Sequence, residues 1–316
     1  MLSRSWETCR HDQSRHSNLF HGLARIILSL NKSRLPRIGS LTLNNQGVIS
    51  LTNRPLTLRL RALENEGIPT NISRNYTYPA VDPYLLDLLG CHDNRIYHQS
   101  NSMHSEADGQ QQLAALTMMR ATLHQHINRD YRYGPFVFTL TDLHQSNIFV
   151  DDEWHITSLI DLEWACSLPI QLQCPPYWLS GKAVDEMPHG EHLETFSHLV
   201  AEFLEAFEEE ETRMVGQQQP LYQAPLMKRF WETGGFWYFH AVNSPKGMCT
   251  IFKQHIQPHF CEEHCRKRIF DEVVAPYWRR DSAGVIERKL KDEECYKDRL
   301  REALVGDASL TDPARW

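Results

Sequence analysis

Apolar residues recur at every third or fourth position along much of the chain, the spacing that produces an amphipathic α-helix. Near the N-terminus, Leu19, Leu23 and Leu30 mark such an apolar stripe, with basic residues largely off it. The pattern predicts a mainly α-helical protein. The stretches predicted as helices are residues 3–30, 84–95, 110–129, 185–211, 226–242 and a charged surface helix over 279–304 with a frayed tail to 316.

Short apolar runs between turn residues predict a few strands among these helices. Residues 38–43 and 48–52 flank Asn44-Asn45-Gln46-Gly47, a strong turn signal, and predict a β-hairpin. With the preceding helix, this hairpin accounts for residues 1–60. We find no repeat or linker and therefore expect a single α+β domain over residues 1–316.

The stretch 136–164 contains the residues most suited to chemistry. Apolar runs at 136–140, 147–150 and 156–160 predict strands, and the acidic turn between the last two predicts a hairpin of buried strands. Polar residues occupy the ends of these runs. The hairpin is therefore expected to bring distant polar side chains together.

Asp142, Asn147 and Asp161 are the polar residues that this hairpin would collect. Carboxylate and amide oxygens are the ligands that suit Mg²⁺, which takes one or two protein carboxylates beside substrate phosphates. In a D-x4-N loop followed by a strand ending in Asp, one Asp accepts a proton while the Asn and the second Asp hold the metal. The alternative is that each residue only caps a turn.

Two segments of this stretch carry a resemblance to a known family. Residues 141–148, TDLHQSNI, and residues 160–164, IDLEW, resemble the H-G-D-x-H-x-x-N and I-D-x-[DE] motifs of the aminoglycoside phosphotransferase and choline kinase-like family, particularly its fungal branch. In that branch a P-P-x-W-L segment commonly follows, as residues 175–179 do here. The resemblance implies a protein kinase-like fold and ATP-dependent phosphoryl transfer to a small-molecule hydroxyl.

The resemblance also implies a role for individual residues. Asp142 corresponds to the catalytic base. Asn147 and Asp161 correspond to the ligands of Mg²⁺ and its ATP, and Glu163 to the second acidic residue of the metal-binding segment. Within the same motifs, the supporting residues are His144 and Trp164.

The chain departs from the family pattern at two places. The family usually has His and Gly before the catalytic Asp, where this chain has Leu140 and Thr141. Its small lobe also supplies a glycine-rich loop and a strand Lys that grip the nucleotide, whereas glycines before residue 136 are isolated and Lys32 is the only lysine before Lys182. The resemblance therefore covers the large lobe, with the N-terminal β-sheet lobe apparently missing.

This leaves two functions open. The chain is either a phosphotransferase or an inactive, pseudokinase-like binding or interaction module. A metal-dependent hydrolase is a third reading, but no nucleophile motif such as G-x-S-x-G supports it.

Composition restricts the partners and the compartment. A formal net charge of -7 and a pI near 6.2 argue against nucleic acid. No apolar run of 18 residues or signal-peptide core is present, so we expect a cytoplasmic protein without a membrane partner. The sequence indicates neither the identity of the phosphate acceptor nor an oligomeric state.

Three further clusters have alternative readings. Histidines and cysteines over residues 255–265 could bind zinc, but the absence of a C-x2-C pair favours a helix start. The acidic run 208–211 could line a binding site, but a solvated helix face is favoured. Aromatic residues over 230–239 could line a pocket, but core packing is favoured because such side chains bury large apolar areas.

Overall fold

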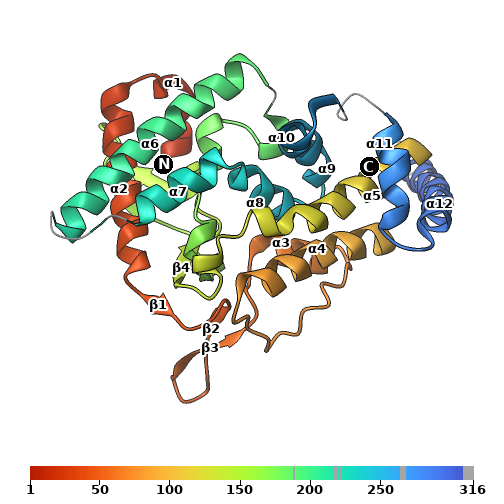
Figure 1. Ribbon diagram of the computed structural model, residues 1–316, viewed down its shortest axis with the longest axis horizontal. Coiled ribbons are helices and arrows are strands. Elements are labelled where there is room, and N and C mark those ends of the chain that lie inside the picture. Colours follow the sequence, from red (N-terminus) through yellow and green to blue (C-terminus); the bar gives the residue numbers. More distant parts are fainter. Residues whose placement is uncertain (188, 217–219, 221, 264–267, 309–316) are drawn as a thin grey trace, which may run out of the picture.

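The computed structural model describes residues 1–187, 189–216, 220, 222–263 and 268–308, which form a mainly helical fold with small antiparallel sheets (Figure 1). This confirms the predicted α+β class. A continuous cluster of buried hydrophobic residues runs from Leu2 to Ile286. The α-helices are α1 (Trp6–Cys9), α2 (Gln13–Asn31), α3 (Leu58–Asn65), α4 (Val81–His98), α5 (Glu106–Thr122), α6 (Glu191–Val215), α7 (Gln223–Glu232), α8 (Gly235–Asn243), α9 (Met248–Ile251), α10 (Gln257–Phe260), α11 (Arg268–Val274) and α12 (Ser282–Ala308).

The strands form one three-stranded sheet and two hairpins within the described chain. Strand β4 lies between β1 and β7, and Leu140 at the end of β4 is opposite Ala165. Strand β7 was not predicted, because its hydrogen-bond partner β4 lies far away in sequence. Both predicted hairpins, β2–β3 and β5–β6, are confirmed as strand pairs. The strands of the second are not buried as predicted, because Thr157 and Ser158 of β6 are exposed. The strands are β1 (Arg34–Leu35), β2 (Ser40–Leu43), β3 (Ile49–Asn53), β4 (Phe136–Leu140), β5 (Ile148–Val150), β6 (Ile156–Leu159) and β7 (Ala165–Pro169).

The N-terminal region is helical but is not the single helix predicted over 3–30. A 3₁₀ turn and α1 precede α2, and Asp12 separates them in an extended conformation. Its carboxylate accepts hydrogen bonds from the backbone N–H groups of Ser14 and Arg15, so it is the N-cap of α2. The apolar stripe of α2 then packs against α6, which lies beside it in Figure 1.

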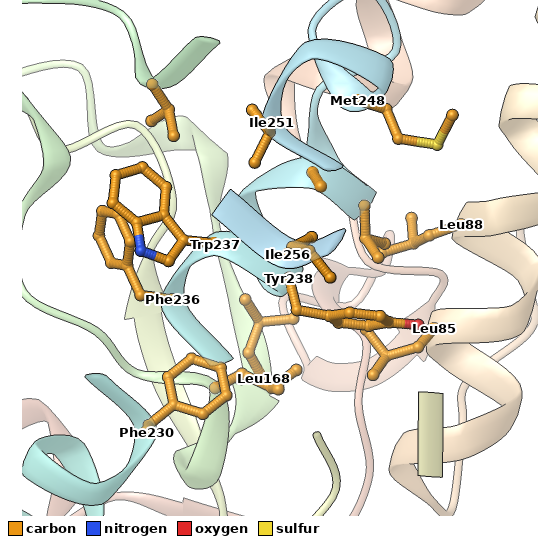
Figure 2. Packing of buried hydrophobic residues seen from close by; sticks show 14 of the residues in the cluster. Leu85, Leu88, Leu168, Phe230, Phe236, Trp237, Tyr238, Met248, Ile251 and Ile256 are labelled. Carbon is orange, nitrogen blue, oxygen red and sulfur yellow. The ribbon is translucent and has the colours of Figure 1, made fainter. Parts of the chain in front are cut away.

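The aromatic residues of 230–239 lie mainly in the core, as predicted. Figure 2 shows Phe230, Phe236, Trp237 and Tyr238 among buried side chains from other helices. The predicted single helix over 226–242 is wrong, because α7 and α8 are separate. Gly234 adopts a left-handed φ of 75° between them, a conformation that glycine adopts without strain.

Several other helix boundaries differ from the sequence pattern. Helix α3 was not predicted, because it is short and polar; Thr57 caps it by accepting from the N–H of Leu60. Helix α4 begins at Val81, three residues earlier than predicted, and Asp82 in its first turn is paired with Arg132 at 2.5 Å. Helix α5 ends at Thr122, seven residues earlier than the pattern predicts.

The acidic run 208–211 is not a wholly solvated face. Glu210 is 3% and Glu211 0% exposed. Glu210 accepts from Arg25 at 3.1 Å and from Arg213 at 2.6 Å. Glu211 accepts from three backbone N–H groups that begin α7, the last of them that of Ala224 at 2.7 Å. The run therefore fastens α6 to α2 and α7.

Helix α12 is likewise more than a surface helix. Val285 and Ile286 are buried, and Lys289 and Glu293 are only 4% exposed. Ile286 packs close to Gly109 of α5. One face of α12 is thus part of the core, whereas the predicted frayed tail at 309–316 lies outside the described residues.

Buried histidines make the stability of this fold depend on pH. Burial lowers the pKa of His92 to about 4, and its Nε2 hydrogen-bonds the carbonyl of Val242 at 2.8 Å. The unfolded chain binds the proton near pH 6.5, so stability is unaffected above that pH and falls as the pH drops toward 4. His92 alone would cost about 3 kcal/mol across this window.

We expect His92→Gln, which can still donate to Val242, to reduce the acid dependence of unfolding by urea between pH 7 and 4.5. His98→Gln provides the control, because His98 is exposed on the same helix. An unchanged pH profile for His92→Gln would contradict a neutral, buried His92.

Candidate functional site

The central strand of the three-stranded sheet delivers Asp142 to the site. Strand β4 ends at Leu140, and the hydroxyl of Thr141 then donates to the carbonyl of Trp164 at 2.5 Å. Trp164 is half-buried beside β7. Thr141 and Trp164 thus fix the point at which the chain leaves the sheet, and Asp142 follows directly.

The loop from Asp142 to Asn147 is closed by its own hydrogen bonds. The side-chain amide of Asn147 donates to the carbonyl of Asp142 at 2.9 Å, and its backbone N–H donates to that of His144 at 2.8 Å. Asn147 is 5% exposed. Its amide oxygen accepts no hydrogen bond from the part of the chain that the structure describes, so it remains available to a ligand.

Side chains on both sides brace the same loop. Nδ1 of His144 hydrogen-bonds the hydroxyl of Ser146 at 2.9 Å, and its Nε2 lies 3.9 Å from the Asp142 carboxylate. Trp178 donates from its indole N–H to the carbonyl of Leu143 at 2.9 Å. The position of His144 agrees with a supporting role.

Asp161 follows β6 in an uncommon backbone conformation. Its φ of 55° and ψ of 51° are left-handed, which few residues other than glycine adopt. The preceding residue, Ile160, donates its N–H to the backbone carbonyl of Asn147 at 3.1 Å. Asp161 and Asp142 line the same narrow recess. Left-handed residues of this kind often occur at functional sites.

The remaining predicted ligand lies farther out. Glu163 is exposed on the 3₁₀ turn Leu162–Trp164 and does not line the recess. Among the described residues no group of three or more His, Cys, Asp or Glu side chains is placed to hold a metal ion. The sequence pattern therefore brings Asp142, Asn147 and Asp161 together, but it does not build a closed, all-protein metal cage.

The oxygen donors of the recess fit Mg²⁺ rather than a softer metal. Asp161 and Asp142 line it and no sulfur or imidazole group of the described residues does, whereas Asn147 lies outside its lining and is joined to it by hydrogen bonds with Asp142 and Ile160. Mg²⁺ keeps several waters and relies on one or two carboxylates plus substrate phosphates. A site with few protein ligands therefore suits Mg²⁺ bound together with a phosphate group.

A large cavity opens on the other side of Asp142. Its volume is about 660 Å³, and α2, α3, β4, the segment 172–178 and α8 contribute to its walls. Most of the lining is apolar, with Leu58, Phe138 and Phe239 among its residues. Asp142 borders both the cavity and the recess that contains Asp161. Asp142 is therefore placed between a cavity that can hold a small molecule and a recess that is too narrow to hold a ligand.

The sequence gives no signal for the polar residues of this cavity. Arg59, Tyr177 and His240 line it but come from α3, a 3₁₀ turn and α8. Burial raises the pKa of Tyr177, with Arg59 opposing and Asp142 reinforcing the shift. Burial, with a smaller effect of Arg59, lowers the pKa of His240 to about 3, so this imidazole is neutral. Such residues share no local motif, and only the fold assembles them.

The His and Cys cluster at 255–265 shows no metal geometry where it is described. His255 is 3% exposed and lies flat on Trp237, with ring centroids 3.7 Å apart. Its Nε2 hydrogen-bonds the carbonyl of Met187 at 3.0 Å. His264 and Cys265 lie outside the described residues. The described part of the cluster thus contributes to packing, and it lies at the end of a helical run that stops at Phe260, not at the helix start that the sequence favours.

No protein family, curated protein or solved structure matched the chain when it was compared with each. None of the described helices is both long and apolar enough to cross a membrane.

Proposed function

We propose that this protein is a phosphotransferase of the kinase-like type, which moves the γ-phosphoryl group of ATP to the hydroxyl of a small molecule. The observation that supports it best is the position of Asp142, which lines both the large cavity and the recess with Asp161. The acceptor would occupy the cavity, and the phosphates would lie outside the recess, which is too narrow to hold them. The resemblance of the two sequence motifs points the same way.

Asp142 acts as the general base in this mechanism. The acceptor hydroxyl gives its proton to the carboxylate as its oxygen bonds to the γ-phosphorus, and the bond between that phosphorus and the β,γ-bridging oxygen breaks to release ADP. Bound Mg²⁺ would supply charge neutralisation for the phosphate oxygens. Asp161 and the amide oxygen of Asn147 would hold it, and Glu163, exposed on the 3₁₀ turn that follows Asp161, would add negative charge nearby.

The hydrogen bonds within the loop serve positioning. Phosphoryl transfer depends mainly on placing reactants and charges, so a base that drifts by an ångström is costly. Asn147 ties the backbone of Asp142 to that of the residue before Asp161. Asn147 thereby sets the spacing of the base and the metal ligand, through its side-chain amide on one side and its backbone carbonyl on the other.

Binding of Mg²⁺·ATP tests this proposal through thermal stability. A ligand that binds only the folded state at 100 times its Kd adds about 2.7 kcal/mol, which raises the Tm by several degrees. We expect this shift in the wild-type protein and its loss in Asp161→Ala. Asp152→Ala is the matched control, because Asp152 is an exposed acid in the turn of the same hairpin.

The absence of any shift at millimolar Mg²⁺·ATP would overturn the proposal. It would favour the inactive binding or interaction module instead. A shift that survives in Asp161→Ala would show that nucleotide binds elsewhere.

A further inference from the structure

The cavity beside Asp142 has the size and lining of a small-molecule site. At about 660 Å³ it falls within the range of pockets that enclose a ligand of a few rings. Apolar side chains such as Leu30, Leu172 and Met227 form much of its wall. The polar groups of a sugar or polyamine would lose their hydrogen bonds to water against this apolar wall without finding new partners. The body of the ligand should therefore be apolar.

Arg59 is the basic group that distinguishes this cavity. Within the described residues no carboxylate lies within ion-pair distance of it, whereas Arg61 on the same helix is 4.0 Å from Glu64. Arg59 is exposed and, after the effect of burial, contributes to the pKa of both Tyr177 and His240, two other residues of the lining. His240 is neutral and cannot share the binding of an anion by charge.

The other charged groups of the lining are placed differently. Lys246 reaches outward to Glu66 at 3.4 Å and is 71% exposed. Asp185 packs against Gly247, where its Oδ2 would be 2.6 Å from an added Cβ. Asp142 is assigned to the acceptor hydroxyl. Arg59 is thus the cavity-lining cation without a partner in the described chain.

We propose that the cavity binds a hydroxylated compound that joins an apolar, ring-sized body to an anionic group, and that Arg59 binds the anion. The body packs against the apolar wall, the anion meets the guanidinium, and Tyr177 offers its hydroxyl between Arg59 and Asp142. The role of this compound as phosphate acceptor rests on the proposed function. Its binding does not, because the contacts involve neither Mg²⁺ nor nucleotide.

Competition between two naphthalene derivatives of opposite charge tests this. N-phenyl-1-naphthylamine, which is neutral and fluoresces in apolar sites, serves as the reporter. Naphthalene-2-carboxylate and naphthalen-2-ylmethylammonium then compete for it, without Mg²⁺ or ATP. A charge-assisted hydrogen bond to Arg59 predicts that the carboxylate displaces the reporter at about tenfold lower concentration than the ammonium.

Single variants test whether Arg59 causes the preference for the carboxylate and whether the reporter binds in this cavity. Arg59→Gln should bring the two competitors to within about twofold of each other, and Arg61→Gln should leave the preference intact. Ala183→Trp, at an exposed position of the cavity lining, should weaken reporter binding at least about tenfold by filling the entrance. Equal competition in the wild type, a preference for the ammonium, or an unchanged preference in Arg59→Gln would overturn the proposal.

The competition assay and the thermal shift by Mg²⁺·ATP together distinguish the proposed ligand class from the proposed phosphoryl transfer. A carboxylate preference that depends on Arg59 supports the ligand class even where Mg²⁺·ATP gives no thermal shift. A thermal shift without that preference supports phosphoryl transfer and contradicts the ligand class.

Discussion

Asparagine in place of Asp142 is expected to lower phosphoryl transfer by about 10²- to 10⁴-fold, the usual contribution of a general base. Asparagine keeps the shape of the side chain but cannot accept the proton from the acceptor hydroxyl. The loop should survive, because the hydrogen bond from Asn147 goes to the backbone carbonyl of Asp142 and not to its carboxylate. Mg²⁺·ATP should therefore still bind.

The rate of ADP formation tests this prediction, since it reports phosphoryl transfer both to water and to an organic hydroxyl. Urea unfolding should give Asp142→Asn nearly the stability of the wild type, and Asp152→Asn should match the wild type in both assays. A variant at Asp142 that retains the wild-type rate would exclude this residue as the base. Loss of folding would assign it a structural role instead.

Truncation of Trp6 to alanine is expected to destabilise the protein by about 3–5 kcal/mol, the range for a large buried aromatic. Trp6 is fully buried, and its ring centroid lies 5.5 Å from those of Trp154 and Trp178. Trp154 in turn donates its indole N–H to the hydroxyl of Ser5 at 3.1 Å. The N-terminal segment thus packs on the turn of the β5–β6 hairpin.

The same contact connects stability to the site. Trp178 touches Trp6 on one side and hydrogen-bonds the carbonyl of Leu143 on the other. Loss of Trp6 should therefore loosen the loop that carries Asp142 as well as the core.

Urea unfolding of Trp6→Ala gives the free-energy change. Trp6→Phe should cost less, because the indole nitrogen of Trp6 has no hydrogen-bond partner to lose within the described chain. Tyr133→Ala, at a side chain that is 73% exposed, should fall within about 0.5 kcal/mol of the wild type. A value that small for Trp6→Ala would contradict the anchoring role.

Local patterns predicted the elements that depend on local physics. The hairpin around Asn44-Asn45-Gln46-Gly47 and the strand Phe136–Leu140 follow from turn chemistry and apolar runs, and both are confirmed. The helices over the apolar stripes were also found. Their ends were less predictable, because Asp12 and Gly234 act through backbone conformations that apolar spacing does not reveal.

Long-range contacts account for what the sequence could not predict. Glu211 resembles any residue of an acidic run, yet it is buried because α7 presents backbone N–H groups to it. Helix α12 has few apolar residues, yet Ile286 is buried against α5. These outcomes depend on partners from distant parts of the chain, which no local window contains.

The candidate site likewise has one part that the sequence predicts and one part that only the fold reveals. Asp142, Asn147 and Asp161 could be selected from spacing alone, and the hairpin brings the segments that carry them together. The cavity on the other side of Asp142 had no sequence signal, because Arg59 and Tyr177 meet only in the folded chain.

The central claim is that Asp161 holds a divalent metal together with a nucleotide. Electron paramagnetic resonance of Mn²⁺, which replaces Mg²⁺ at oxygen-rich sites, tests it most directly in the presence of the non-hydrolysable ATP analogue AMP-PNP. We expect about one bound Mn²⁺ per chain that requires the nucleotide, disappears in Asp161→Ala and persists in Asp152→Ala. Mn²⁺ that stays free with nucleotide, or that binds equally well to Asp161→Ala, would contradict it.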